Sequence, residues 1–185
     1  MSQSKAKTNQ LQTIETAIRE ASDFQDALQV TLQKVCESSA WEYGEAWIPT
    51  SDGILALSPV WYSDPDIEAL EKFRLCSEAF ILSANTGLPG RVWSSKQPEW
   101  IEDVGATSET YFLRNQIAKA CSVKAGFGIP ITTNDEVIAV IVFFMRQAQA
   151  ENPQLIELVK AAATQLEQIL LHSSVSDRYS STENI

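Results

Sequence analysis

The feature that most constrains the fold is a run of nine apolar residues, VIAVIVFFM, at residues 137–145. The run is about half as long as the ~18 residues of a membrane-spanning helix, and its β-branched and aromatic side chains favour a central strand. The preceding segment, residues 123–132, has the same character, and its glycines in GFGIPI leave room for large neighbours. The polar residues 133–136 between the two segments predict a hairpin turn.

A second hairpin is predicted earlier in the chain. Residues 43–48 and 55–61 have strand character and flank residues 49–53, which end in an Asp-Gly pair. Asp-Gly favours the tight turns of antiparallel hairpins. Two hairpins indicate antiparallel pairing, whereas a doubly wound sheet would need regular β-α-β alternation.

Helical periodicity is strongest at the two ends. Apolar spacing predicts a leading helix up to Ala21, a second helix over residues 23–37 and a closing helix over residues 153–172. Asp23 can cap the second helix, and the Asn152-Pro153 pair is a start signal for the last one. Helices at both ends of an antiparallel sheet predict an α+β architecture.

The segment between the hairpins mixes short elements. We expect helices over residues 66–76, 88–95 and 108–120, and strands over residues 79–84 and 100–104. The whole chain then divides into a leading helix or linker (1–22), one globular domain (23–172) and a disordered Ser-rich tail (173–185).

Composition excludes several classes of function. There are 14 Lys and Arg against 24 Asp and Glu, and a net charge of −10 disfavours nucleic-acid and membrane-surface partners. The single histidine, His172, stands beside the polar tail, which argues against a histidine-rich metal site or a Ser–His–Asp triad. The first residues lack the apolar stretch of a signal peptide, so we expect a cytoplasmic protein.

Three cysteines, Cys36, Cys76 and Cys121, lie far apart in the sequence and form no CxxC motif. Their odd number and the reducing compartment argue against a disulfide framework. We expect Cys36 and Cys76 to be buried small apolar residues.

Several ordered motifs resemble a GAF domain, especially the GAF modules of bacterial and cyanobacterial sensor histidine kinases and signalling proteins. They are TGLPGRVWSSKQPEWIEDV (86–104), VKAGFGIPI (123–131) and VIAVIVFFM, with SAWEYGEAWIP resembling the first strand and AAATQLEQILLH the closing helix. The resemblance covers roughly residues 23–172. It implies an antiparallel sheet of about six strands, with the terminal helices on one face and connections around a ligand pocket on the other.

We take aromatic and charged residues of the middle segment as candidates for that pocket. The lining candidates are Trp61, Leu88, Trp93, Trp100, Tyr111, Phe112 and Phe127, and the orienting candidates are Arg91, Asp103 and Arg114. The planar fork of Arg91 suits a carboxylate or a phosphate. The alternative is that these residues are ordinary core and rim packing, with residues 87–90 a turn that opens a short helix.

Three specialised branches of the family match poorly. Photosensory GAF domains attach a bilin through a cysteine usually followed by histidine, but here Cys121 is followed by Ser122, so we expect no covalent bilin. Of the Asn-Lys-Phe-Asp-Glu set of cyclic-nucleotide-binding GAF domains, only Asp135-Glu136 is present, in a predicted turn. In free methionine-R-sulfoxide reductases, cysteines stand where this chain has Pro89 and Lys119.

We therefore expect a non-enzymatic sensory or regulatory domain that binds a small ligand or a signalling partner and signals through its terminal helices. The sequence identifies no cofactor. Apolar residues Leu11, Ile14 and Ile18 of the leading helix predict a homodimer, without a long coiled coil of its own. The alternatives are an enzyme of the methionine-R-sulfoxide reductase type and a ligand-free dimerisation or scaffold module.

Overall fold

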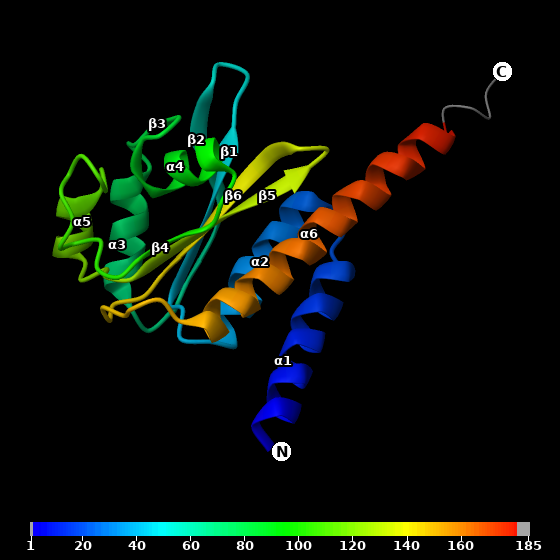
Figure 1. Cartoon of the computed structure of the whole chain (residues 1–185), viewed down its shortest axis with the longest axis horizontal. Coiled ribbons are helices and arrows are strands. Elements are labelled where there is room, and N and C mark those ends of the chain that lie inside the picture. Colours follow the sequence, from blue (N-terminus) through cyan, green and yellow to red (C-terminus); the bar gives the residue numbers. More distant parts are fainter. Residues whose placement is uncertain (1, 181–185) are drawn as a thin grey trace.

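Two hairpins build the centre of a six-stranded antiparallel sheet, as the sequence predicts. The computed structural model describes the backbone of residues 2–180 and the side chains of residues 8–172 (Figure 1). The strands are β1 (Tyr43–Pro49), β2 (Ile54–Ser63), β3 (Leu82–Ser83), β4 (Glu99–Ile101), β5 (Gly126–Thr133) and β6 (Glu136–Phe144). Their order in the sheet is β3-β2-β1-β6-β5-β4, with every neighbouring pair antiparallel.

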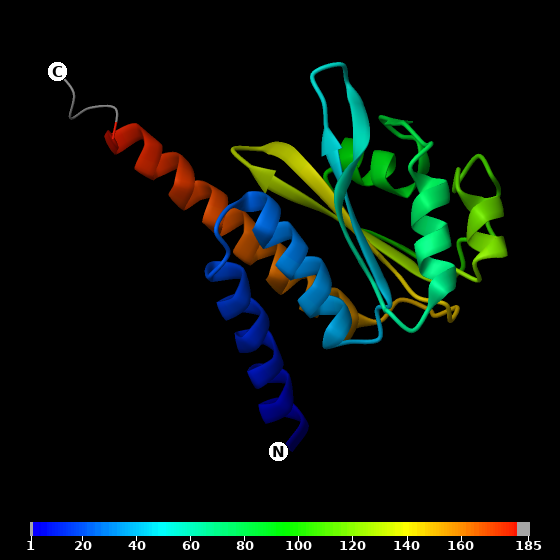
Figure 2. The same ribbon diagram turned by 180° about the vertical axis from the view of Figure 1, so that it is seen from behind.

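Helices cover both faces of this sheet. They are α1 (Ser2–Arg19), α2 (Phe24–Glu37), α3 (Glu68–Ser77), α4 (Gly87–Ser95), α5 (Asn115–Ala120) and α6 (Pro153–Ser180). Helices α2 and α6 lie on one face, which we call the helix face, and α1 packs against both of them. Helices α3, α4 and α5 cover the other face, the connection face (Figure 2). The α+β architecture and the placement of the terminal helices on one face are as predicted.

A hairpin turn and two helix caps form at the residues from which the sequence predicts them. In the β5–β6 hairpin Asn134 and Asp135 both have positive φ, +50° and +64°, as a tight two-residue hairpin turn requires. The Asp23 carboxylate accepts a hydrogen bond from the Asp26 backbone N–H at 2.8 Å and starts α2. At the start of α6 the Asn152 side chain accepts from the N–H groups of Gln154 and Leu155.

The run VIAVIVFFM is a central strand because both of its faces are buried. Ala139, Ile141 and Phe143 belong to the core under α1, α2 and α6. Val140, Val142 and Phe144 alternate with them and belong to the core under α3, α4 and α5. The neighbouring strand β5 gives Phe144 room through Gly126, where a Cβ atom would lie 2.7 Å from the ring. The glycine in GFGIPI is thus required by close packing.

The largest differences between the predicted elements and the structure are in α5, β3 and α6. Helix α5 begins at Asn115 because residues 108–114 form turns, in which the N–H groups of Tyr111 and Phe112 donate to the Ser108 carbonyl. Strand β3 is only two residues long. Helix α6 continues past His172 to Ser180, so part of the tail expected to be disordered is helical, and no Pro or Gly interrupts it there. Residues 181–185 lie outside the described residues.

The apolar stripe of α1 is used within one chain. Ile14 and Ile18 are 2% and 0% exposed, and Leu11 is half-buried against the same core. The chain turns between α1 and α2, so that α1 packs back on α2 and α6 (Figure 1). The prediction that Ile14 and Ile18 offer free surface to a second copy is therefore wrong, and the homodimer itself stays a prediction.

Candidate functional site

The connection face holds a buried ion pair at the place where a ligand pocket was expected. Glu45 of β1 and Arg114, the residue before α5, are 0% and 2% exposed. Arg114 donates from Nη2 to Glu45 Oε1 at 2.6 Å and from Nη1 to Oε2 at 3.0 Å. Tyr43 Oη and Trp47 Nε1 donate to the same carboxylate at 2.9 and 2.8 Å. We call Tyr43, Glu45, Trp47 and Arg114 the buried charge cluster.

Strand geometry and aromatic packing produce this cluster. Residues 43, 45 and 47 alternate along β1 and therefore point to the same face of the sheet. The Arg114 guanidinium lies 5.0 to 5.5 Å from four ring centroids, those of Trp47, Phe73, Phe112 and Phe144. Burial, and then the Glu45 charge, raise the pKa of Tyr43 well above its usual value, so its hydroxyl remains a donor. The protein's own side chains fill this space.

The structure brings only some of the predicted pocket residues together. Leu88, Phe112 and Arg114 are buried in the connection-face core, and Trp61 and Trp93 pack half-buried against it. Trp100 and Phe127 lie on the opposite, helix face, where they contact Trp41. The structure therefore does not bring these two residues together with the other candidates. Trp100 pairs directly with Phe127 across β4 and β5, and the two-residue period of a strand places both on the helix face.

The remaining orienting candidates have local partners. Arg91 donates from Nε and Nη2 to Glu99, at 2.6 Å for the shorter contact, and its guanidinium lies 3.8 Å from the ring centroid of Tyr111. Tyr111 Oη donates to the same carboxylate at 2.9 Å, and partial burial followed by this hydrogen bond raises its pKa. The Asp103 carboxylate accepts from the Gly105 N–H and holds a turn. Arg91 is therefore already neutralised by Glu99.

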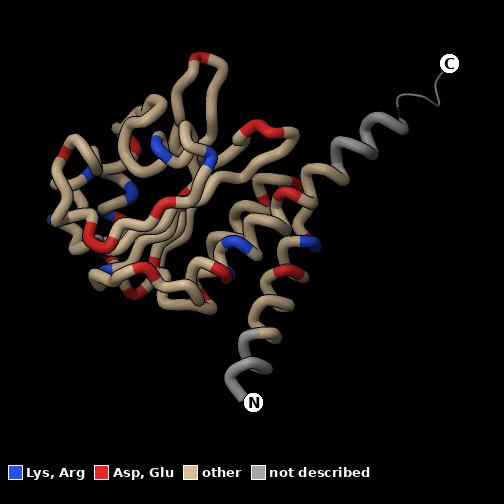
Figure 3. Tube along the Cα trace, in the orientation of Figure 1, with Lys and Arg blue, Asp and Glu red and all other residues tan. Residues whose placement is uncertain are grey.

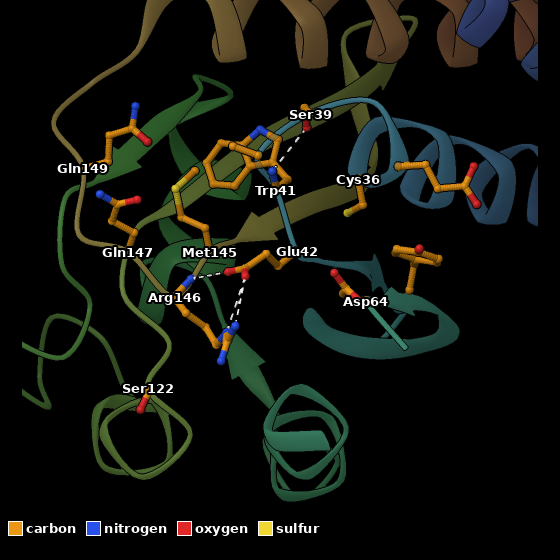
Figure 4. Close-up of a pocket in the computed structure, with 13 residues that line it drawn as sticks. Cys36, Ser39, Trp41, Glu42, Asp64, Ser122, Met145, Arg146, Gln147 and Gln149 are labelled. Atoms are coloured by element: carbon orange, nitrogen blue, oxygen red, sulfur yellow. Dashed lines mark hydrogen bonds and ion pairs between the residues drawn. The ribbon is translucent and has the colours of Figure 1, made fainter. Parts of the chain in front are cut away.

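A cavity of about 740 Å³ opens at one end of the sheet, where the α2–β1, β2–α3 and β6–α6 connections meet (Figure 4). We call it the strand-end cavity. It is lined by Cys36, Glu37, Ser39, Ala40, Trp41, Glu42, Tyr62, Asp64, Ser122, Met145, Arg146, Gln147 and Gln149. On its wall Glu42 accepts from the backbone N–H of Arg146 at 2.6 Å and faces the guanidinium at 3.4 Å.

The strand-end cavity is acidic. Its described lining includes the carboxylates of Glu37, Glu42 and Asp64 against the guanidinium of Arg146. Burial, and then the charges of these three carboxylates, raise the pKa of the Cys36 thiol well above its usual value. The thiol is therefore protonated near neutral pH and is a poor nucleophile. The arrangement suits hydrogen-bonded recognition of a neutral or cationic group.

The family model described as GAF domain matches residues 21–170, most of the chain. The chain belongs to the GAF family. Among solved structures, this GAF domain is similar to the GAF domain of a Coxiella burnetii phosphoenolpyruvate-protein phosphotransferase, with 17% identity and a TM-score of 0.72, covering 94% of this chain and 98% of that one. The corresponding Acinetobacter domain has 14% identity and a TM-score of 0.68, covering 93% and 97%.

An enzyme of the same fold is also similar to this GAF domain. Free methionine-R-sulfoxide reductase from Neisseria meningitidis, solved with its substrate, has 16% identity and a TM-score of 0.68, covering 89% of each chain. At these identities the likeness shows the shared fold and leaves activity open.

The sequence prediction did not include the strand-end cavity. Glu42 and Arg146 are far apart in the sequence and meet because Tyr43 pairs with Phe144 across β1 and β6. The sequence did contain a signal for this contact, because an acidic residue, Glu42, precedes one predicted central strand and a basic residue, Arg146, follows the other. Only the pairing of these two strands shows that the two charges meet.

The cysteines of this GAF domain do not share one site. Cys36 is buried in the helix-face core, as predicted, and Cys121 in the connection-face core. Cys76 is exposed, so the expectation that it is buried is wrong. Partial burial, and then the nearby Cys76, raise the pKa of Cys121.

Metal and membrane features can be assessed for the described part of the chain. It contains no group of three or more His, Cys, Asp and Glu residues suited to a metal ion. None of its helices has the length and apolar character needed to cross a bilayer. Lysines and arginines are scattered among the acidic residues, which also occupy the tips of both hairpins (Figure 3).

Proposed function

We propose that this GAF domain is a cytoplasmic sensory or regulatory module that binds a small molecule or a protein partner in the strand-end cavity and signals through its terminal helices. The observation that carries the proposal is the position of the cavity between the end of α2, with the segment that follows it, and the segment that leads into α6. The three free cysteines are compatible with a reducing compartment.

The cavity walls give an occupant contact with both helical connections. Cys36 and Glu37 end α2, and Met145 to Gln149 connect β6 to α6. Gln149 is held to the sheet because its carbonyl accepts from Trp100 Nε1 at 2.9 Å. A ligand moves the balance between two helix arrangements only by binding one of them better. A full switch from 1:99 to 99:1 needs about 10⁴-fold difference in affinity between the two states.

Native mass and absorption spectrum of the purified protein test this proposal first. Added mass or colour indicates a bound ligand. Hydrogen exchange of α2 and α6 is then measured with and without that ligand. We expect Glu42→Gln to weaken ligand binding and to remove the ligand's slowing of hydrogen exchange in both helices. Glu20→Gln, an exposed substitution directly after α1, should change neither. Binding without any change in α2 or α6 contradicts signalling through these helices. If neither mass nor colour is found and no compound binds, the scaffold alternative replaces the proposal.

We propose further that the domain has no catalytic activity of its own. The positions of the cysteines support this, because Cys36 and Cys121 lie in cores on opposite faces of the sheet and burial raises the pKa of both thiols. Reduction of free methionine-R-sulfoxide in the presence of dithiothreitol is the assay. Turnover that disappears in the Cys→Ser series would establish the reductase and remove the non-enzymatic proposal.

A homodimer remains part of the proposed function. Helix α6 extends beyond the edge of the sheet (Figure 1), and Leu171 on it is 44% exposed. We expect light scattering after size-exclusion chromatography to give the mass of two chains and Leu171→Glu to give the mass of one. A single-chain mass for the unmodified protein at high concentration refutes the dimer without affecting ligand binding.

A further inference from the structure

Arg74 of α3 is a buried cation whose hydrogen bonds are incomplete. Its side chain is 4% exposed. Nη2 donates to the Ser58 carbonyl at 2.6 Å, and Nε lies 3.5 Å from Glu78 Oε1 without forming a hydrogen bond. Nη1 is buried and has no hydrogen-bond partner in the described part of the chain. Arg114, by contrast, donates from both of its terminal nitrogens to Glu45.

An unpaired N–H group on a buried cation is costly. Leaving a buried donor unsatisfied costs about 1–3 kcal/mol, and more when the group is charged. Glu78 compensates only partly, because its side chain is 55% exposed and its oxygen is at the outer limit of an ion pair. The position therefore favours an additional anionic acceptor close to Arg74.

A groove of about 380 Å³ lies beside this guanidinium at the β2 edge of the sheet. It is lined by Ala56, Leu57, Pro59, Arg74, Glu78, Phe80 and Ile81, and we call it the edge groove. Strand β3 pairs only with Ile54 and Leu55, so the β2 edge is not covered by a strand beyond that point. Ile81 is 66% exposed, an unusual position for a large apolar side chain beside a buried charge.

We propose that the edge groove binds a small amphipathic carboxylate. Its carboxylate pairs with the guanidinium of Arg74, which lines the edge groove, by a side-chain movement that exposes the buried Nη1. Its apolar part covers Leu57, Phe80 and Ile81. The volume is at the lower end of the roughly 300–1,000 Å³ range of small-molecule sites, which suits a short acyl or aryl acid. The edge groove and the strand-end cavity share no lining residue, so this proposal and the proposed function can fail independently.

Glu78 makes a distinctive prediction possible. Its carboxylate lies beside the same guanidinium and opposes an incoming anion. Removing its charge should therefore strengthen binding, whereas removing the charge of Arg74 should weaken it. A merely hydrophobic surface would respond to neither substitution.

The test measures the binding of octanoate to the full chain. Isothermal titration calorimetry gives the affinity, and the amide chemical shifts of β2 and α3 locate the site. Acetate, octanol and octylamine separate the contributions of charge and apolar tail. We expect octanoate to bind more tightly than the other three. We expect Arg74→Gln to weaken it by about tenfold or more, the factor for one charge-assisted hydrogen bond. We expect Glu78→Gln to strengthen octanoate binding. Arg19→Gln, at an exposed position of α1, should leave it unchanged.

Ile81→Ser keeps the test decisive if Arg74→Gln does not fold, because Ile81 is exposed and its loss leaves the core intact. It should weaken octanoate several-fold and leave the weak acetate binding unchanged. The proposal is overturned if octanoate does not bind at millimolar concentration, or if octanol binds equally well. The proposal is also overturned if neither Ile81→Ser nor Glu78→Gln changes the affinity for octanoate. The same holds if octanoate changes amide chemical shifts only around the strand-end cavity.

Discussion

Replacing Arg114 with methionine removes one half of the buried charge cluster while conserving most of the side-chain volume. The Glu45 carboxylate, 0% exposed, then keeps the Tyr43 and Trp47 donors but loses both hydrogen bonds and the positive charge of the guanidinium. Removing one partner of a buried ion pair costs about 3–5 kcal/mol. Because a domain is stable by about 5–15 kcal/mol, this is a large share of the total.

Urea unfolding followed by circular dichroism measures this cost. We expect Arg114→Met and Glu45→Leu each to lower the free energy of unfolding by about 3–5 kcal/mol, and the double variant to lose much less than the sum. The matched control is Arg91→Met, whose pair with Glu99 is 20% and 24% exposed and is worth about 1 kcal/mol or less. A loss at Arg114 no greater than at Arg91, or additive effects of Arg114→Met and Glu45→Leu, would refute the assignment of a tightly coupled buried pair.

Further predictions concern packing and pH. Gly126→Ala places a Cβ atom 2.7 Å from the Phe144 ring and should cost about 1–3 kcal/mol in thermal unfolding, and an unchanged melting temperature would contradict that close approach. Ile18→Ala should cost about 2–5 kcal/mol because Ile18 is fully buried within one chain, and a loss that depends on protein concentration would instead indicate a dimer contact. Since the folded state raises the pKa of Cys36, its contribution to stability is present below the usual thiol pKa of 9.0 and is lost as pH rises above it. Unfolding measured across that range should show a smaller decline in Cys36→Ala, and an equal decline would show that Cys36 does not cause it.

Local chemistry explains why much of the fold could be predicted. Asn134 and Asp135 tolerate positive φ, so the β5–β6 turn is specified by the two residues that form it. Asp23 caps α2 through a hydrogen bond to a residue three positions away. These interactions need no partner from elsewhere in the chain, and the sequence patterns that signal them are correspondingly short.

The candidate sites were less predictable because they depend on contacts between distant segments. Arg114 was chosen as an orienting residue for a ligand, and its partner Glu45, 69 positions away, was not among the candidates. Phe127 was grouped with residues of the connection face but lies on the helix face, since one step along a strand reverses the side on which a residue lies. The helical continuation of α6 past His172 was also missed, because Ser-rich composition favours disorder without excluding a helix.

By itself, the sequence determined the helical ends, the two hairpins, the α+β class and the family, because these depend on periodicity, turn chemistry and ordered motifs. Only the tertiary structure decided which residues meet. The pairing of β1 with β6 brings Glu42 to Arg146 at the strand-end cavity. The packing of α3 against β2 buries Arg74 with an unpaired N–H group. Burial and charge pairing depend on the surroundings of each group, and those surroundings exist only after distant strands and helices have packed together.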